Sequence, residues 1–260
     1  MHPGAWLAWT FFGGIAVMTT TNPFYLLPAL GACYLVHTVH GQEGPHARSF
    51  RFFLFFGALT MTTRTLLALF SPGGAGAESF AFAALEGLRL AVLLVLFGTF
   101  NSVSDPFRVL RLSPRRFHEP ALAAALALSI APRTIDAAVR VREAQRLRGL
   151  DISRWRSWPA LAVPVLETGM EEAMTLAESM DARGHGRGSR SRYRPDPWTL
   201  RSSLVTLGAP AVAAVVVFAV VEVVGDVTVS TFPLRWPEAH PVLVVAALGL
   251  AMPAAFGVER

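Results

Sequence analysis

The chain contains no lysine, so all 23 of its lysine-plus-arginine positions are arginines. A Walker A nucleotide site needs a lysine at the phosphates, and imine catalysis needs a lysine amine. The sequence therefore excludes both kinds of site. We expect the isolated chain neither to bind nor to hydrolyse ATP.

Other patterns of catalysis and metal binding are missing as well. The single cysteine, Cys33, lies in an apolar run and can form neither an intrachain disulfide nor a cysteine-based zinc cluster. No G-x-S-x-G or H-E-x-x-H motif occurs, since His118-Glu119 is followed by Pro120 and no second histidine. We expect a non-catalytic protein with no cofactor and no bound metal.

One group of residues has a spacing that a metal ion would accept. Polar side chains are also expected at this point, because the chain would leave the membrane here. We favour the second interpretation. The group consists of His37, His40, Glu43 and His46.

Charged residues are scarce, at 16% of the chain against 53% hydrophobic residues, and the mean hydropathy is +0.44. These values are typical of a polytopic membrane protein. We predict an all-α fold with about six spanning helices, of which the first two are close to the minimum length for crossing a bilayer. The apolar runs cover about residues 5–19, 24–39, 52–70, 80–100, 203–224 and 241–257.

The arginines are distributed unevenly along this pattern. Arg235 is the only arginine in the loops expected outside, whereas twelve arginines fall between residues 140 and 201. The positive-inside rule then places both termini in the cytoplasm. We divide the chain into an N-terminal transmembrane region of about four spans, a cytosolic region, and a C-terminal transmembrane region of about two spans. These regions are residues 1–119, 120–201 and 202–260.

The cytosolic region is predicted to hold two long amphipathic helices. The apolar stretch 121–131 reaches only roughly 17 Å as a helix, short of the ~30 Å hydrocarbon core, and we expect Pro132 to interrupt it. The second helix begins with the apolar stretch 159–166, which contains Pro164. The sequence leaves open whether these two stretches enter the membrane.

Both helices end in the same pair of residues, at Arg148-Gly149 and at Arg183-Gly184. Glycine just past a helix end adopts the left-handed conformation without a Cβ clash, and arginine suits the negative end of the helix dipole. A single copy indicates only a well-capped helix. Two copies indicate two docking points for a partner that has two similar binding sites.

Methionines are spaced along one face of the second helix. Such a stripe is typical of a packed core, but no soluble core is evident here, and methionine also suits adaptable binding surfaces. We interpret the stripe as a candidate interface with another membrane subunit. It consists of Met170, Met174, Ala177 and Met180.

Four charged residues inside or near the apolar runs suggest an alternative function. Intramembrane charges are candidates for an ion path, and a self-contained ion-coupled carrier would use them. Such carriers usually place the site between repeated halves, and no repeat is visible in the spans. Two of the charges are also spaced to pair with each other, three residues apart on one helix. The residues are Arg64, Glu86, Arg89 and Glu222.

An arginine-, glycine- and serine-rich stretch covers residues 183–194. It is similar to RNA-binding segments of that composition. Because it is short and tethered between membrane elements, we favour contact with anionic lipid and expect no nucleic-acid partner.

These features together resemble the transmembrane T component of energy-coupling factor (ECF) transporters, a family that includes the membrane subunits of cobalt uptake. The resemblance covers nearly the whole chain, and the paired Arg-Gly endings are its specific signal. The second ending has the usual Ala182-Arg183-Gly184, and the first has Leu147 in place of alanine. Further matching stretches are Asn22 to Leu27, Glu143 to Gly149, Val163-Pro164, Met180 to Gly184 and Tyr193 to Pro195.

The resemblance implies a coupling subunit of an ABC-type importer for a vitamin or a metal ion, in a bacterial inner membrane. The two coupling helices would cross, and their ends would dock on two ABC-type ATPase subunits. A substrate-binding membrane subunit, the S component, would rest on the apolar surfaces. The docking residues would be Leu147, Arg148, Gly149, Ala182, Arg183 and Gly184. The substrate is not encoded in this chain.

The arginine distribution predicts which side of the membrane each loop faces. In variants with Cys33 replaced, a cysteine at position 235 should react with a membrane-impermeant thiol reagent added to intact cells, and cysteines at 148 or 183 should not. Labelling at 183 from outside would contradict this topology.

Overall fold

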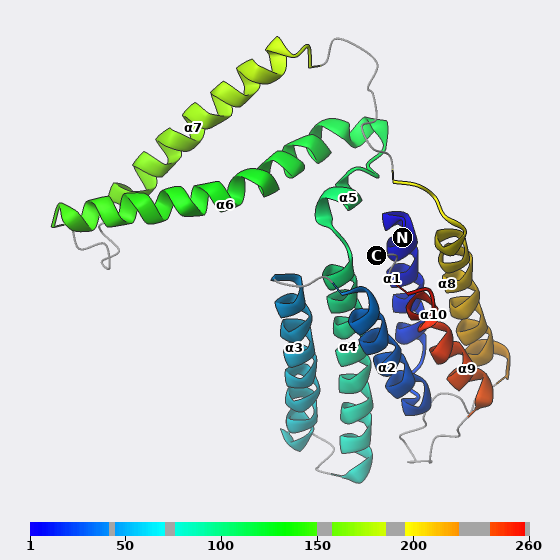
Figure 1. The fold of residues 1–260 in the computed structure, drawn as a ribbon. Helices are drawn as coiled ribbons and strands as arrows, with labels where there is room; N and C mark the ends of the chain where they lie inside the picture. The colour runs from blue at the N-terminus through cyan, green and yellow to red at the C-terminus, as the bar shows by residue number, and fades with distance from the viewer. Residues whose placement is uncertain (42–44, 71–75, 150–157, 186–195, 224–239, 258–260) are drawn as a thin grey trace. The chain divides into compact units, whose positions relative to one another are not determined.

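The structure is a computed structural model that describes residues 1–41, 45–70, 76–149, 158–185, 196–223 and 240–257. The elements in these ranges are all helical (Figure 1). The chain divides into two compact units. Unit 1 combines Met1–Leu112 with Asp196–Arg260, and unit 2 is Ser113–Pro195.

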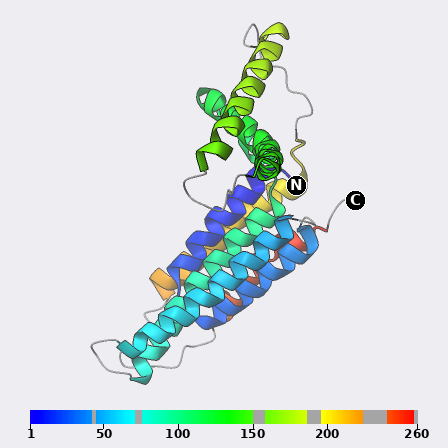
Figure 2. The same ribbon diagram turned by 90° about the vertical axis from the view of Figure 1, so that its left-hand side faces the viewer.

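Unit 1 is a helical bundle in which α1, α2, α4, α8 and α9 pack against one another, with α3 alongside α4 (Figures 1 and 2). The Trp9 indole on α1 donates a hydrogen bond to the Leu250 carbonyl at 3.0 Å, inside the core. The helices are α1 (Pro3–Thr19), α2 (Pro23–His40), α3 (Pro45–Leu67), α4 (Ala77–Val103), α5 (Pro106–Leu110), α8 (Leu200–Phe218), α9 (Pro241–Gly249) and α10 (Met252–Ala255). Short turns extend α3 as η1 (Ala68–Phe70) and α8 as η4 (Ala219–Val223).

Several helices of unit 1 begin where a polar residue precedes a proline. Proline suits the first helical position because its missing N–H has no partner there in any helix. The polar side chain caps a free N–H: Asn22 accepts from Phe24 at 2.9 Å and Asp105 accepts from Phe107 at 2.9 Å. The pattern occurs at His2-Pro3, Asn22-Pro23, Asp105-Pro106 and His240-Pro241.

The helices α3 and α4 approach closely because glycines lie at their contact. A Cβ atom added at Gly87 would lie 2.9 Å from the Cα atom of Met61, and one added at Gly57 would lie 3.2 Å from the carbonyl oxygen of Ala91. Small residues of this kind allow helix backbones to pack in a membrane, where van der Waals contact drives association.

Three helical segments are long and apolar enough to cross a membrane: Ala77–Val103, His118–Leu147 and Leu200–Val221. The predicted count of six spans is therefore not confirmed, although a helix occurs at each of the six predicted runs. The last run differs from prediction, because it forms α9 and α10 instead of one helix. Pro253 explains the break, since it has no N–H to continue the helix by bonding to Gly249.

The described residues of unit 2 form a short turn, η2 (Arg115–Phe117), and two long helices, α6 (His118–Leu147) and α7 (Trp158–Ala182). The helices meet near the end of α6, where the Gln145 side-chain amide donates to the Ala160 carbonyl at 3.2 Å. From this contact they diverge as a V in the view of Figure 1, and the crossing implied by the family resemblance is not confirmed.

The predicted interruption at Pro132 is wrong. Helix α6 continues through this residue for 30 residues in total, and α7 likewise continues through Pro164. A proline inside a helix removes one hydrogen bond, here to the carbonyl of Leu128. Both Leu128 and Pro132 are exposed. A solvent molecule can donate a hydrogen bond to the Leu128 carbonyl in place of the missing N–H, so the helix does not have to end at Pro132.

The close contact at Gly87 predicts that the effect of a glycine-to-alanine substitution depends strongly on its position. Gly87→Ala should lower the unfolding temperature in detergent, because the added carbon meets backbone and overpacking costs about 1–3 kcal/mol. Gly31→Ala on α2 is the matched control, since nothing lies within 4 Å of its added carbon. Equal unfolding temperatures for the two variants would contradict the α3–α4 packing.

Candidate functional site: two arginine–glycine helix ends

The end of α7 is closed by a pair of backbone hydrogen bonds. The Gly184 N–H donates to the Asp181 carbonyl at 2.8 Å, and the His185 N–H donates to the Met180 carbonyl at 3.0 Å. Gly184 has a φ of 75°, in the left-handed region. This is the Schellman arrangement, and it confirms the predicted role of the glycine.

The end of α6 has the same local geometry. Gly149 has a φ of 82°, and its N–H donates to the Arg146 carbonyl at 3.0 Å. The Arg148 N–H donates to the carbonyls of Ala144 and Gln145 at 3.2 and 3.1 Å. Each glycine therefore turns the chain away directly after the arginine, so that Arg148 and Arg183 are the first residues after the ends of their helices.

The side chains at both ends are available for binding. Arg148, Arg183 and Ala182 are exposed, and Leu147 is 91% exposed. Within the described part of the chain, neither guanidinium makes an ion pair or a side-chain hydrogen bond. Among the described residues, Arg148 and Arg183 are thus two exposed cations without a side-chain partner on capped helix ends.

The two ends are far apart within unit 2. Helix α7 starts close to the end of α6, as the Gln145–Ala160 hydrogen bond shows, and Arg183 follows its last residue. A helix of 25 residues is about 37 Å long. The two arginines are therefore separated by nearly the length of α7, too far to enter one socket on a partner.

The predicted methionine stripe is exposed on α7. Met170 and Met174 are 68% and 64% exposed, Ala177 is exposed, and Met180 is half-buried. Sequence analysis missed that the stripe continues toward the start of the helix. Val163 and Leu166 lie on the same face at spacings of three and four residues, and are 59% and 65% exposed.

The structure brings three of the four candidate intramembrane charges together. The Glu86 carboxylate lies 2.8 Å from the Arg89 guanidinium and 3.7 Å from that of Arg64. Arg89 also donates to the Met18 carbonyl at 3.4 Å, at the negative end of the α1 dipole. These contacts favour a structural role for the cluster. The side chain of Glu222 lies outside the described residues.

The histidines at the end of α2 have other contacts than a metal. His37 Nδ1 lies 2.9 Å from the Ser102 hydroxyl, and its ring stacks on Phe50 at 3.8 Å. The His40 ring packs edge-on against Trp6. Among the described residues, no three potential ligands form a metal site. Glu43, the His46 side chain and most of the arginine-rich stretch 183–194 lie outside the described residues.

Known proteins with similar sequences are transporter subunits. Three relatives are named energy-coupling factor transporter transmembrane protein EcfT. The relative from Exiguobacterium sibiricum is 29% identical over 185 residues, which cover 58% of this chain and 69% of the relative. That from Bacillus selenitireducens is 28% identical over 191 residues, covering 62% and 69%.

The third relative, from Streptococcus equi subsp. equi, is 32% identical over 128 residues, and the chain spans about half of its length, at 48%. Residues 2–193 also match the family model described as "CbiQ: Cobalt transport protein". This match takes in well over half of the chain. The protein therefore belongs to the CbiQ cobalt transport family and is a transmembrane T component of the energy-coupling factor type.

Proposed function

We propose that this protein is the coupling subunit of an ECF-type importer, which passes a conformational change from ATPase subunits to a substrate-binding membrane subunit. The observation that carries this proposal is the pair of exposed Arg-Gly ends on unit 2. Two equivalent projections separated by about 37 Å fit two similar partner subunits. The transported substrate would be a vitamin or a metal ion, selected by another chain.

The docking contacts would be made by Arg148 and Arg183 on two ABC-type ATPases. A planar guanidinium can bind a carboxylate or several carbonyls through two parallel hydrogen bonds. Gly149 and Gly184 lack side chains, so a partner backbone can approach each arginine closely. Ala182 favours this approach at one end. Leu147 instead projects a large apolar side chain, which would fill an apolar pocket at the other end.

The exposed stripe of α7 would receive the substrate-binding membrane subunit. It offers a continuous apolar surface, and the flexible methionines at its centre can adapt to more than one partner shape. Glu167 and Glu178 lie four residues after Val163 and Met174, so they border this surface and would form its polar rim. We propose Met170, Met174, Ala177 and Met180, extended by Val163 and Leu166, as this interface.

The topology completes the proposal. Unit 1 would lie in a bacterial inner membrane with both chain termini in the cytoplasm, and the region 120–201 would form the cytosolic coupling region. The chain would contribute no catalysis, because ATP hydrolysis requires a lysine-containing site that it lacks.

The proposal predicts that the two arginines act together in holding the ATPases. Each Arg→Ala change removes charge-assisted contacts worth about 1.5–3 kcal/mol, or roughly ten- to a hundredfold in affinity. A preassembled ATPase dimer can mask a single change through avidity. Arg148→Ala/Arg183→Ala should therefore release both ATPases from the purified complex, while Arg→Lys variants should retain part of the binding.

The matched control is Arg133→Ala/Arg142→Ala, which removes the same charge from exposed positions of α6. ATPase recovered with the membrane subunit is measured at equal expression. Wild-type recovery in Arg148→Ala/Arg183→Ala, or equal loss in the control, would refute docking through the helix ends.

A further inference from the structure

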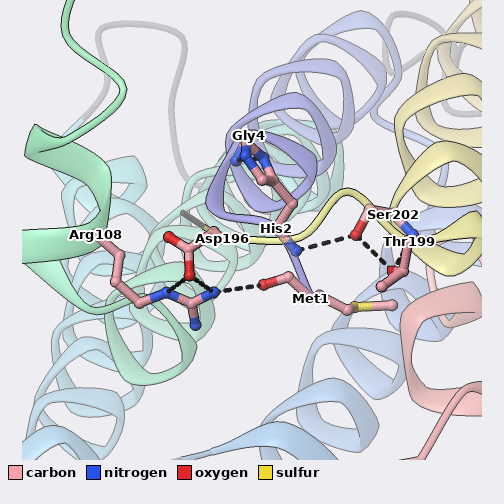
Figure 3. A network of polar contacts seen from close by, with 7 residues as sticks. All are labelled: Met1, His2, Gly4, Arg108, Asp196, Thr199 and Ser202. Carbon is pink, nitrogen blue, oxygen red and sulfur yellow. Dashed lines mark hydrogen bonds and ion pairs between the residues drawn. The ribbon is translucent and has the colours of Figure 1, made fainter. Parts of the chain in front are cut away.

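The two points at which the chain leaves and re-enters unit 1 are tied together. The first segment of unit 1 ends at Leu112, and the second begins at Asp196. Arg108, on α5 just before the exit, forms an ion pair with Asp196 at the return (Figure 3). The Nη2 atom lies 2.8 Å from Asp196 Oδ1, and Nε donates to the same oxygen at 3.1 Å.

The start of the chain connects this ion pair to α8. Arg108 Nη2 donates to the Met1 carbonyl at 3.1 Å, and the His2 N–H donates to the Ser202 hydroxyl at 3.0 Å (Figure 3). The His2 ring also packs on Trp198 at 4.6 Å between centroids. The exit, the return and α1 therefore share one network.

The return segment is fixed on α8 by its own contacts. The Thr199 hydroxyl caps α8 by accepting from the Ser202 N–H at 3.3 Å, and the Trp198 indole donates to the Ser203 hydroxyl at 2.7 Å. Ser202 is fully buried. Asp196 is thus held three residues before a capped helix, which limits the positions that its carboxylate can occupy.

The neutral form of His2 belongs to this arrangement. Its Nδ1 atom accepts from the Gly4 N–H at 3.1 Å, which requires an unprotonated nitrogen. Burial of the ring lowers the pKa of His2, and the nearby Asp196 carboxylate offsets this effect only in part. The cap on α1 is therefore kept at neutral pH.

The ion pair is poorly suited to hold the bundle together. The side chains of Arg108 and Asp196 are 38% and 23% exposed, and partly exposed ion pairs add little to the stability of a fold. Unit 1 has two buried apolar clusters that serve this purpose. The geometric effect of the pair is larger, because it joins residues 88 positions apart in the sequence, one just before unit 2 and the other just after it.

We propose that Arg108 and Asp196 are positioning residues that fix both connections of unit 2 to a single base on the bundle. This inference rests on the proposed coupling function. A displacement of unit 2 by the ATPases is passed to unit 1 when the two connections cannot move independently. With the ion pair broken, the same displacement is absorbed in the connections.

The test measures the position of unit 2 directly. Spin labels are placed at exposed Phe97 on α4 and exposed Thr175 on α7, in a chain with Cys33→Ala. Double electron–electron resonance should give a narrow distribution of the distance between the two labels in the otherwise wild-type chain. Arg108→Asp places two carboxylates face to face and should abolish the narrow distribution, and Arg108→Asp/Asp196→Arg should restore it.

The same variants are compared in the complex with co-purified ATPases. ATP with vanadate should shift the distance distribution of the wild type, and Arg108→Asp should lose this shift while retaining the ATPases and their hydrolysis. We expect the movement of unit 2 that accompanies ATP hydrolysis to be reduced roughly tenfold in Arg108→Asp. Arg111→Asp is the matched control, because Arg111 is exposed on the same segment and has no ion pair among the described residues.

The outcomes separate this inference from the proposed function. If the wild-type chain retains no ATPases, the proposed function fails, and the distances in the isolated chain still test the ion pair. An unchanged distribution in Arg108→Asp, or no recovery in the charge-exchanged variant, overturns the inference. If Arg108→Asp does not fold, Arg108→Gln replaces it, and failure of that milder variant to fold also overturns the positioning role.

Discussion

Inside a bilayer, no water is available to backbone N–H and C=O groups, so each must be bonded within a helix or by a side chain. The arrangement of unit 1 depends on this constraint. Several of its helices begin at a polar cap followed by proline, as at Asn22-Pro23 and Asp105-Pro106, where proline has no N–H that would need a partner. Its helix contacts use glycine and alanine, because packing must replace the missing hydrophobic drive between helices in lipid.

The helices of unit 2 are stabilised differently from those of unit 1. Pro132 within α6 is accommodated at an exposed position and Pro164 within α7 at a partly exposed one, and the apolar stripe of α7 is not covered by another part of the described chain. A helix pair of this kind gains little stability from its own contact, and in the proposed function the docked subunits would add to that stability.

The sequence predicted those features that depend on local chemistry. The helix ends at Gly149 and Gly184 followed from the left-handed preference of glycine, and their φ values confirm it. Features that depend on environment were mispredicted, such as continuity through Pro132, because solvent access decides what an interior proline costs. Contacts between residues distant in the sequence, such as Arg108 with Asp196, could not be predicted, since the sequence does not show which charged residues pair.

The Arg-Gly ends and the Arg108–Asp196 pair address two parts of one mechanical problem. A coupling subunit must receive force at defined points and must also have a fixed base against which that force acts. Capped helices would supply the first requirement, because a glycine in the left-handed conformation ends each helix directly after its arginine. The ion pair would supply the second, because it joins the point where the chain leaves unit 1 to the point where it returns. Docking strength and coupling efficiency should therefore be separable: changes at Arg148 and Arg183 act on the first, and changes at Arg108 act on the second.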